Sequence, residues 1–278
     1  MSTKEKYIVS QDSEGTRLDK ILAELVPDSG LRLRRRLCDD GRVLVNGRGG
    51  KPGYKVLAGQ EIVILEGDKS MTYEELGLSI ISQSELFAAI YKPGGVHSAS
   101  IAGKDSSSVE SVLPEMLPDS TPVLLNRLDF LTSGILLVAL GPDGATAYHE
   151  EESKGEMKKF YLATVHGRLD GVVTIENSLD VDDRKKTRVL DETDSDTRRW
   201  TNVEVVSHDH DNDTTVVRCL ISKGARHQIR AHLAAIGHPI VGDALYGDGA
   251  EGDVLHLHHE LIEFAGFRAE SKALWNNG

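Results

Sequence analysis

The chain has 278 residues, of which 39% are hydrophobic and 27% charged, and its net charge is −12. These values fit a soluble globular protein with one large domain or two unequal ones. No apolar run approaches the roughly 20 residues that span a bilayer, and the polar residues 1–6 do not resemble a secretory signal, so we expect no membrane association. Two cysteines cannot build a disulfide framework, which favours a reducing cytoplasm.

The acidic total argues against a nucleic-acid partner without excluding one. Nucleic-acid binders usually present a basic face, and their binding depends on local phosphate contacts rather than on total charge. The acidic residues are dispersed or lie in expected loops such as 209–213, whereas four arginines are bunched within 32–36. A local basic surface is therefore compatible with the composition.

The residues from 12 to 66 predict a small N-terminal α/β domain. Apolar residues recur at helical spacing over 18–25, so we expect an amphipathic helix there with Thr16 as its N-cap. A second helix is expected over about 29–40, with Leu33 and Leu37 inward. Gly41 is well placed to end it. Short strands are expected at 43–45, before the tight turn Asn46-Gly47, and at 61–65.

From residue 85 to 278 we predict a catalytic-size domain in which strands dominate. The clearest strand patterns lie at 86–91, 123–125, 135–140, 159–165, 200–206 and 215–221. Helical patterns are interleaved near 107–116, 143–153 and 227–236. The mostly polar segment 67–84 is interpreted as a linker. The predicted fold class is therefore α+β.

The segment 126–140 is the most informative part of the chain. Arg127-Leu128-Asp129 is followed by small residues and then by an apolar strand pattern. Loops anchored on rigid core elements commonly carry catalytic groups. The same tripeptide occurs at 17–19, which we interpret as a solvated helix face, and at 168–170, in a turn. An isolated aspartate of this kind most often stabilises a turn, so context distinguishes Asp129.

Several motifs occur in the order typical of the pseudouridine synthases of the RluA type, which residues 86–264 resemble. The matching segments are Tyr91-Lys92-Pro93-Gly94-Gly95-Val96, Arg127-Leu128-Asp129, Lys159-Phe160-Tyr161-Leu162-Ala163, His227-Gln228-Ile229-Arg230-Ala231-His232-Leu233, Gly237-His238-Pro239-Ile240-Val241-Gly242-Asp243 and Leu245-Tyr246-Gly247. The resemblance implies a mixed, largely antiparallel sheet with flanking helices and a central cleft. It also implies conversion of uridine to pseudouridine in RNA.

The same resemblance assigns expected roles. Asp129 matches the catalytic aspartate, Tyr161 the active-site tyrosine, and Arg230 the basic residue that pairs with the aspartate. Arg127 would fill the gap left by the flipped base, and Arg226 is a further candidate RNA contact. The chain departs from the family's common residues at Asn126, before Arg-Leu-Asp, and at Ala225, where arginine is common.

Residues 16–65 resemble the alpha-L RNA-binding motif, a small module that often precedes this catalytic domain. The resemblance rests on Arg17-Leu18-Asp19, Asp40-Gly41-Arg42-Val43 and Val45-Asn46-Gly47. It implies that the arginine-rich helix faces RNA, through Arg32, Arg34, Arg35 and Arg36. Without that context such an arginine cluster is usually a solvated helix face.

The expected reaction needs only one ionised carboxylate. Isomerisation breaks the ribose–nitrogen bond, turns the uracil over and rejoins it through carbon without redox chemistry, so we expect no cofactor. A carboxylate near C1′ can attack it or remove a ribose proton, once the uridine has flipped out. Arg230 would keep Asp129 charged and oriented. Tyr161 would offer its ring and hydroxyl to the uracil.

The expected function is therefore an RNA pseudouridine synthase acting on large-subunit ribosomal RNA rather than transfer RNA, as a cytoplasmic monomer. Alternatives are a synthase of transfer RNA and a non-catalytic RNA-binding or RNA-folding protein on the same scaffold. Histidines at 208 and 210, and at 256, 258 and 259, lack a structural zinc spacing, so we expect no metal. Asp129, Tyr161 and Arg230 together favour the enzyme.

Overall fold

The computed structural model describes residues 3–27, 29–39, 41–65, 71–100, 107–183 and 185–276, without the side chains of residues 3–5, 32, 36 and 276. Two compact units emerge from the contacts within the chain. Unit 1 contains residues 1–71 and 100–107, and unit 2 contains residues 72–99 and 108–278. Of the described helices, none is both long and apolar enough to cross a membrane.

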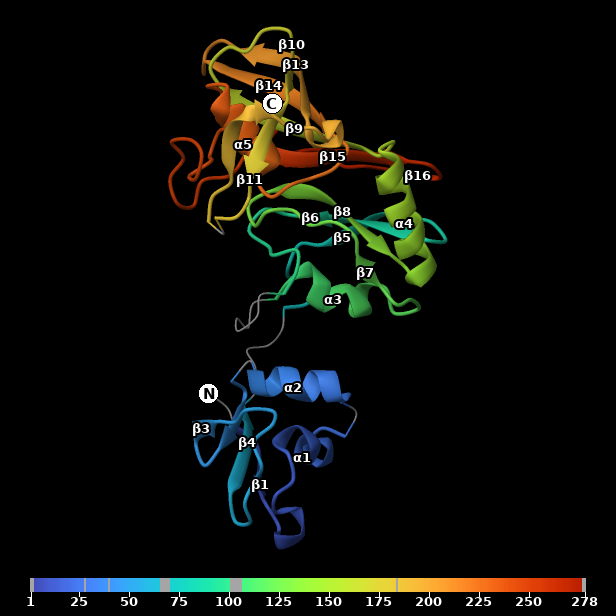
Figure 1. The fold of residues 1–278 in the computed structure, drawn as a ribbon, viewed down its shortest axis with the longest axis vertical. Coiled ribbons are helices and arrows are strands. Elements are labelled where there is room, and N and C mark those ends of the chain that lie inside the picture. Colours follow the sequence, from blue (N-terminus) through green and yellow to red (C-terminus); the bar gives the residue numbers. More distant parts are fainter. Residues whose placement is uncertain are drawn as a thin grey trace. The chain divides into compact units, whose positions relative to one another are not determined.

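Unit 1 packs two helices against a four-stranded antiparallel sheet (Figure 1). The helices are α1 (Leu18–Leu25) and α2 (Leu31–Asp39), and a 3-10 turn at Gln11–Ser13 precedes them. The strand order is β1 (Thr3–Ile8), β4 (Glu61–Leu65), β2 (Val43–Val45) and β3 (Arg48–Gly49). Leucines of α1 and Ile21 meet valines of β2 in the core. Both expected helices are confirmed.

Three details of unit 1 differ from the sequence predictions. The N-cap of α1 is Arg17, not Thr16. Leu33 is 47% exposed rather than inward, because α2 directs Leu37 toward the core instead. Asp19, expected on a solvated helix face, is 1% exposed and receives hydrogen bonds from Arg17 at 2.7 Å and from Arg35 at 3.0 Å. The first Arg-Leu-Asp thus contributes a buried carboxylate that pairs with two exposed arginines.

Unit 2 is built on one large mixed sheet (Figure 1). Its path runs β10-β13-β14-β9-β15-β8-β6-β5, with β16 beside β15 and β7 beside β8. Paired strands are antiparallel except β15 and β8, which are parallel. The strands are β5 (Ser79–Gln83), β6 (Phe87–Lys92), β7 (Val123–Leu124), β8 (Ser133–Ala139), β9 (Lys158–His166), β10 (Val172–Ile175), β13 (Thr201–Asp209), β14 (Thr214–Ile221), β15 (Leu257–Phe264) and β16 (Phe267–Glu270).

Helices cover both faces of this sheet, because side chains alternate along its buried strands. In β8, Ile135 and Leu137 pack with α4 (Pro142–Lys154), while Leu136 and Val138 belong to the cluster of α3 (Val109–Met116) and α5 (Gln228–Ala235). The pair β11 (Asn177–Asp180) and β12 (Arg188–Thr193) forms a separate small sheet. Two more 3-10 turns lie at Thr197–Arg199 and Leu274–Asn276. The predicted mixed α+β class is confirmed.

The segment 67–84 is not wholly a linker. Strand β5 lies within it and pairs with β6 at the end of the large sheet. Leu76 and Leu78 are buried in the core of unit 2. The polar pattern of this segment hid the strand, because β5 is an edge strand with one side toward solvent.

Candidate active site

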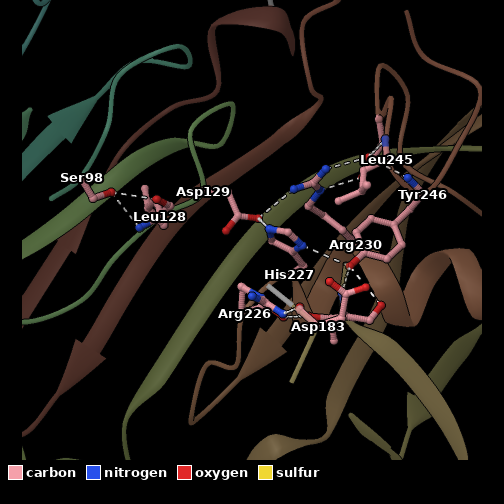
Figure 2. A network of polar contacts seen from close by, with 11 residues as sticks. Ser98, Leu128, Asp129, Asp183, Arg226, His227, Arg230, Leu245 and Tyr246 are labelled. Atoms are coloured by element: carbon pink, nitrogen blue, oxygen red, sulfur yellow. Dashed lines mark hydrogen bonds and ion pairs between the residues drawn. The ribbon is translucent and has the colours of Figure 1, made fainter. Parts of the chain in front are cut away.

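Asp129 lies in the loop that enters β8, at the middle of the large sheet. Thr132 N donates to Asp129 O at 3.1 Å, which makes the expected turn. The buried Ser98 hydroxyl donates to Leu128 O at 2.8 Å and accepts from Leu128 N at 3.0 Å (Figure 2). The backbone N–H and C=O groups of Leu128, next to the aspartate, are therefore both hydrogen-bonded. The Asp129 side chain is 24% exposed.

The Lys-Pro-Gly turn at residues 92–94, where β6 ends, is hydrogen-bonded to the Asp129 loop. Lys92 is fully buried, and its Nζ donates to Pro93 O at 2.9 Å and to Phe130 O at 3.2 Å. Burial lowers the pKa of Lys92 to about 7, against the opposing charge of Asp129. A Cβ on Gly94 would lie 2.8 Å from Leu131 O. Glycine there permits the close approach of the two loops.

Arg230 of α5 joins two carboxylates (Figure 2). Its Nη1 donates to Asp129 Oδ2 at 3.0 Å, while Nε and Nη2 donate to the two oxygens of Asp243 at 2.7 and 2.8 Å. The Arg230 side chain is only 8% exposed. A planar guanidinium suits this bidentate and bridging geometry, which lysine cannot reproduce.

Asp243 is the buried anchor of Arg230. It is fully buried, and its Oδ1 also accepts from Leu245 N at 2.9 Å and Tyr246 N at 3.1 Å. Burial alone would raise the pKa of Asp243, but the hydrogen bonds and charge of Arg230, together with the N–H groups of Leu245 and Tyr246, outweigh burial and hold that pKa below its ordinary value. Sequence reasoning quoted Asp243 within a motif without giving it a role. The sequence alone does not show that Asp243 pairs with Arg230, because this contact forms only when the loop that carries Asp243 packs against α5.

His227 was also missed as a site residue. It precedes α5 in a left-handed conformation with φ 54°, and its Nε2 lies 3.8 Å from Asp129 Oδ2. Its Nδ1 lies 3.1 Å from Tyr246 Oη (Figure 2). The Arg230 guanidinium lies over the Tyr246 ring, 5.3 Å from its centroid. The spacing of three residues between His227 and Arg230 was the available signal, since it places both at the start of one helix.

Tyr161 lies on β9, on the same face of the sheet as α5. Three neighbouring strands bring it near the Asp129 loop: Tyr161 is paired with His259 of β15, and His259 with Gly134 of β8. The rings of Tyr161 and His259 stack at 4.4 Å with an interplanar angle of 13°. Burial raises the pKa of Tyr161, and the charge of Asp129 raises it further. Gly134 is required here, because a Cβ would overlap the His259 backbone.

The structure brings Asp129, Tyr161 and Arg230 to one face of unit 2, but not all the candidate RNA contacts. Arg127 is exposed in the same loop as Asp129. Arg226 donates to the backbone oxygens of Val181, at 2.9 Å, and Asp183 (Figure 2). The remaining candidates are on α2 in unit 1: Arg34 is partly buried, Arg35 is bound to Asp19, and the side chains of Arg32 and Arg36 lie outside the described residues.

The two departures from the family pattern have local structural roles. Asn126 Oδ1 accepts from Leu137 N at 2.7 Å, so the side chain fastens the chain to β8. Ala225 N donates to Gln228 Oε1 at 2.9 Å at the start of α5. Neither residue touches the Asp129 carboxylate in a contact between described residues. In the described parts of the chain, no group of three His, Cys, Asp or Glu is placed to hold a metal ion.

Comparisons with known proteins match both units. The model of the RNA pseudouridylate synthase family matches residues 87–235, and that of the S4 domain matches residues 16–62. The ribosomal large subunit pseudouridine synthase D of Escherichia coli strain K12 is 30% identical over 252 residues, covering 86% of this chain and 75% of the relative. The Xanthomonas campestris pv. campestris protein of the same name is 28% identical over 280 residues, covering 97% and 83%.

A solved structure shares the fold of most of this chain. Human RNA pseudouridylate synthase domain containing 1 superposes with a TM-score of 0.56 at 24% sequence identity. The match covers 70% of this chain and 82% of the human chain. At this identity the likeness concerns the fold alone.

Proposed function

This chain belongs to the RNA pseudouridylate synthase family, of the RluA type with an S4 domain, and on that premise we propose that Asp129 is its catalytic carboxylate and large-subunit ribosomal RNA its substrate. As a member of the family it is an isomerase that converts uridine in RNA to pseudouridine. The proposal therefore concerns which residues act, and on which RNA.

The observation that carries the role of Asp129 is the placement of Arg230 between two carboxylates. Two guanidinium nitrogens, Nε and Nη2, donate to Asp243, and the third, Nη1, donates to Asp129 Oδ2. This charge-assisted hydrogen bond fixes the orientation of the Asp129 carboxylate. Among the described residues no hydrogen bond or ion pair reaches Oδ1, so that oxygen remains free to react.

The free oxygen of Asp129 would act at the ribose. By attacking C1′, or by removing a ribose proton, it allows the C1′–N1 bond to break and the uracil to leave with the bonding electrons. The uracil turns over and C5 bonds to C1′. In the first route the bond between Asp129 and C1′ breaks at this step, and in the second route Asp129 returns the proton to the ribose. The C5 proton is then lost and N1 gains one, so the product is an isomer of uridine.

Tyr161 and Arg127 would act on the bases. Tyr161 is held by the His259 ring behind it, so its other side is suited to contact the turning uracil. The raised pKa of Tyr161 favours the neutral hydroxyl as a hydrogen-bond donor. Arg127 is exposed next to Asp129 and suited to replace the flipped uridine by stacking and hydrogen bonding.

The S4 unit would supply RNA-binding contacts that take no part in the reaction itself. Arg34 and Arg35 of α2, with Arg32 and Arg36, would contact phosphates, and Arg226 is a further candidate in unit 2. Arg35 is 51% exposed despite its bond to Asp19, so part of its guanidinium is available. The same basic face is compatible with the acidic total charge, because binding depends on local contacts.

The choice of ribosomal RNA rests on the relatives, whose names specify the ribosomal large subunit. We further propose that the protein acts on this RNA in the cytoplasm, and that it does so as a monomer. The test is to map pseudouridines in total RNA from cells with and without this protein. Loss of one or a few sites in large-subunit ribosomal RNA, restored by the native protein, is the expected result. Loss confined to transfer RNA would contradict the assigned substrate.

A further inference from the structure

The hydrogen bonds of Tyr246 determine which nitrogen of His227 carries the proton. Tyr246 Oη lies 2.8 Å from Thr187 N, 3.1 Å from Thr187 O and 3.1 Å from His227 Nδ1. The backbone N–H donates to the hydroxyl, whose own hydrogen must go to the Thr187 carbonyl. All three contacts are hydrogen bonds only if His227 Nδ1 is the donor. A neutral imidazole then has a bare lone pair on Nε2.

That bare nitrogen lies beside the reactive carboxylate. His227 Nε2 is 3.8 Å from Asp129 Oδ2, too far for a hydrogen bond. The side chains of His227 and Asp129 are 15% and 24% exposed, so both are partly accessible to a bound molecule. Nε2 is therefore an acceptor that the protein positions next to Asp129 without using it internally.

We propose that His227 Nε2 is the base that removes the proton from C5 at the end of the reaction, a role that rests on the proposed function of Asp129 at C1′. Once the new bond has formed, C5 is attached to the carbon that Asp129 reaches, so a base beside Asp129 lies near the C5 hydrogen. The C5–H bond breaks, its electrons restore the uracil ring, and the proton goes to Nε2. The imidazolium releases it to water, and N1 takes one proton from water.

The surroundings of His227 keep its imidazole in the neutral form, which can accept a proton. Burial lowers its pKa, so the neutral form prevails at physiological pH. Asp129 and Asp243 oppose that shift, while Arg230 and Arg226 add to it, and Lys186 lies over the Tyr246 ring at 4.9 Å. Release of Asp129 restores its negative charge when the imidazolium forms. Tyr161 is the other candidate base, but burial raises its pKa and disfavours the phenolate.

The test measures the isotope effect at C5 in the whole protein. The probe is RNA extracted from cells that lack this protein, grown on uracil with either hydrogen or deuterium at C5, because such RNA contains the target whatever its class. His227→Asn is the main variant, since asparagine tolerates the left-handed backbone but is not a base. His210→Asn is the matched control, at an exposed histidine between β13 and β14.

The expected result is a fall in turnover of about 10²–10⁴-fold for His227→Asn, the range of lost general-base catalysis. Deuterium should slow this variant much more than the native protein, because C5 deprotonation becomes rate-limiting. His210→Asn should match the native protein in both respects. Tyr246→Phe, which keeps the ring but frees Nδ1, should give a smaller fall.

Two results would overturn the role of His227. One is native turnover by His227→Asn, and the other is a slow variant with no increased isotope effect, which would indicate a structural role. Failure of the proposed function is a separate outcome, because it requires Asp129→Asn to make pseudouridine at the native rate.

Discussion

Arg230 Nη1 donates to Asp129 Oδ2 at 3.0 Å, although the two residues are 101 positions apart in the chain. The contact depends on a loop that enters β8 and on a helix that starts after β14. Because the other two guanidinium nitrogens donate to Asp243, the guanidinium cannot turn away from Asp129 without breaking a buried ion pair. The carboxylate is oriented by the fold before any RNA binds.

Arg230→Lys tests this orientation. Lysine keeps the charge but cannot donate to both carboxylates in a plane. We expect turnover to fall by about 10²-fold or more, since small displacements of a catalytic group have costs of that order. We also expect stability to fall by roughly 1–3 kcal/mol from imperfectly paired buried Asp243.

Turnover assays and thermal unfolding measure the two effects of Arg230→Lys. Arg218→Lys is the matched control, because Arg218 makes a bidentate pair with Glu260 but is 42% exposed. An exposed pair contributes little, so this control should retain activity and nearly native stability. Equal effects of the two substitutions would contradict the special position of Arg230.

Gly94→Ala tests the contact between the Lys-Pro-Gly turn and the Asp129 loop. The new Cβ would meet Leu131 O at 2.8 Å, so the loop must shift. We expect turnover to fall by about 10–100-fold with little change in RNA affinity. Gly224→Ala is the control, since its Cβ meets nothing closer than 3.7 Å. Turnover and RNA affinity are measured for both variants on one target RNA. Equal turnover of the two variants would contradict the importance of this close contact.

The α2 arginines can be tested through salt dependence. Arg34→Gln with Arg35→Gln should weaken RNA binding and reduce the slope of log affinity against log salt by about one for each lost phosphate contact. Arg168→Gln is a control at an exposed, paired arginine of unit 2. Binding titrations at several salt concentrations measure the slopes. An unchanged slope in the double variant would remove α2 from the RNA interface.

Acid should loosen α1 through Asp19. Its hydrogen bonds from Arg17, with a smaller contribution from Arg35, outweigh burial and lower the pKa of Asp19 from 3.8 to about 2. The ion pairs therefore stabilise the fold fully above the ordinary pKa and are lost as the pH falls toward 2. The exposed arginines make the effect modest.

Hydrogen exchange of α1 peptides in the native protein and in Asp19→Asn measures this contribution. The difference in protection between the two proteins should shrink as the pH falls from 3.8 to 2. Protection that differs equally at both pH values would contradict the assigned ion pairs.

Local patterns predicted the main elements, because apolar periodicity follows from burial on one face. Helix α1 and strand β4 match the expected ranges, and the order of the motifs indicated Asp129, Tyr161 and Arg230. Contacts between residues far apart in the chain could not be predicted from these local patterns. The edge strand β5 lacks a strong pattern, and the burial of Asp19 depends on an arginine of another helix. Asp243 and His227 acquire their roles only when α5 packs beside the Asp129 loop.

The most direct test of the central claim is pseudouridine formation by purified Asp129→Asn. Asparagine preserves the shape and can still face Arg230, but it cannot attack C1′ as a carboxylate or take a proton. We predict normal folding and RNA binding with no detectable pseudouridine at the site that the native protein modifies. Pseudouridine formed by this variant at the native rate would contradict the account.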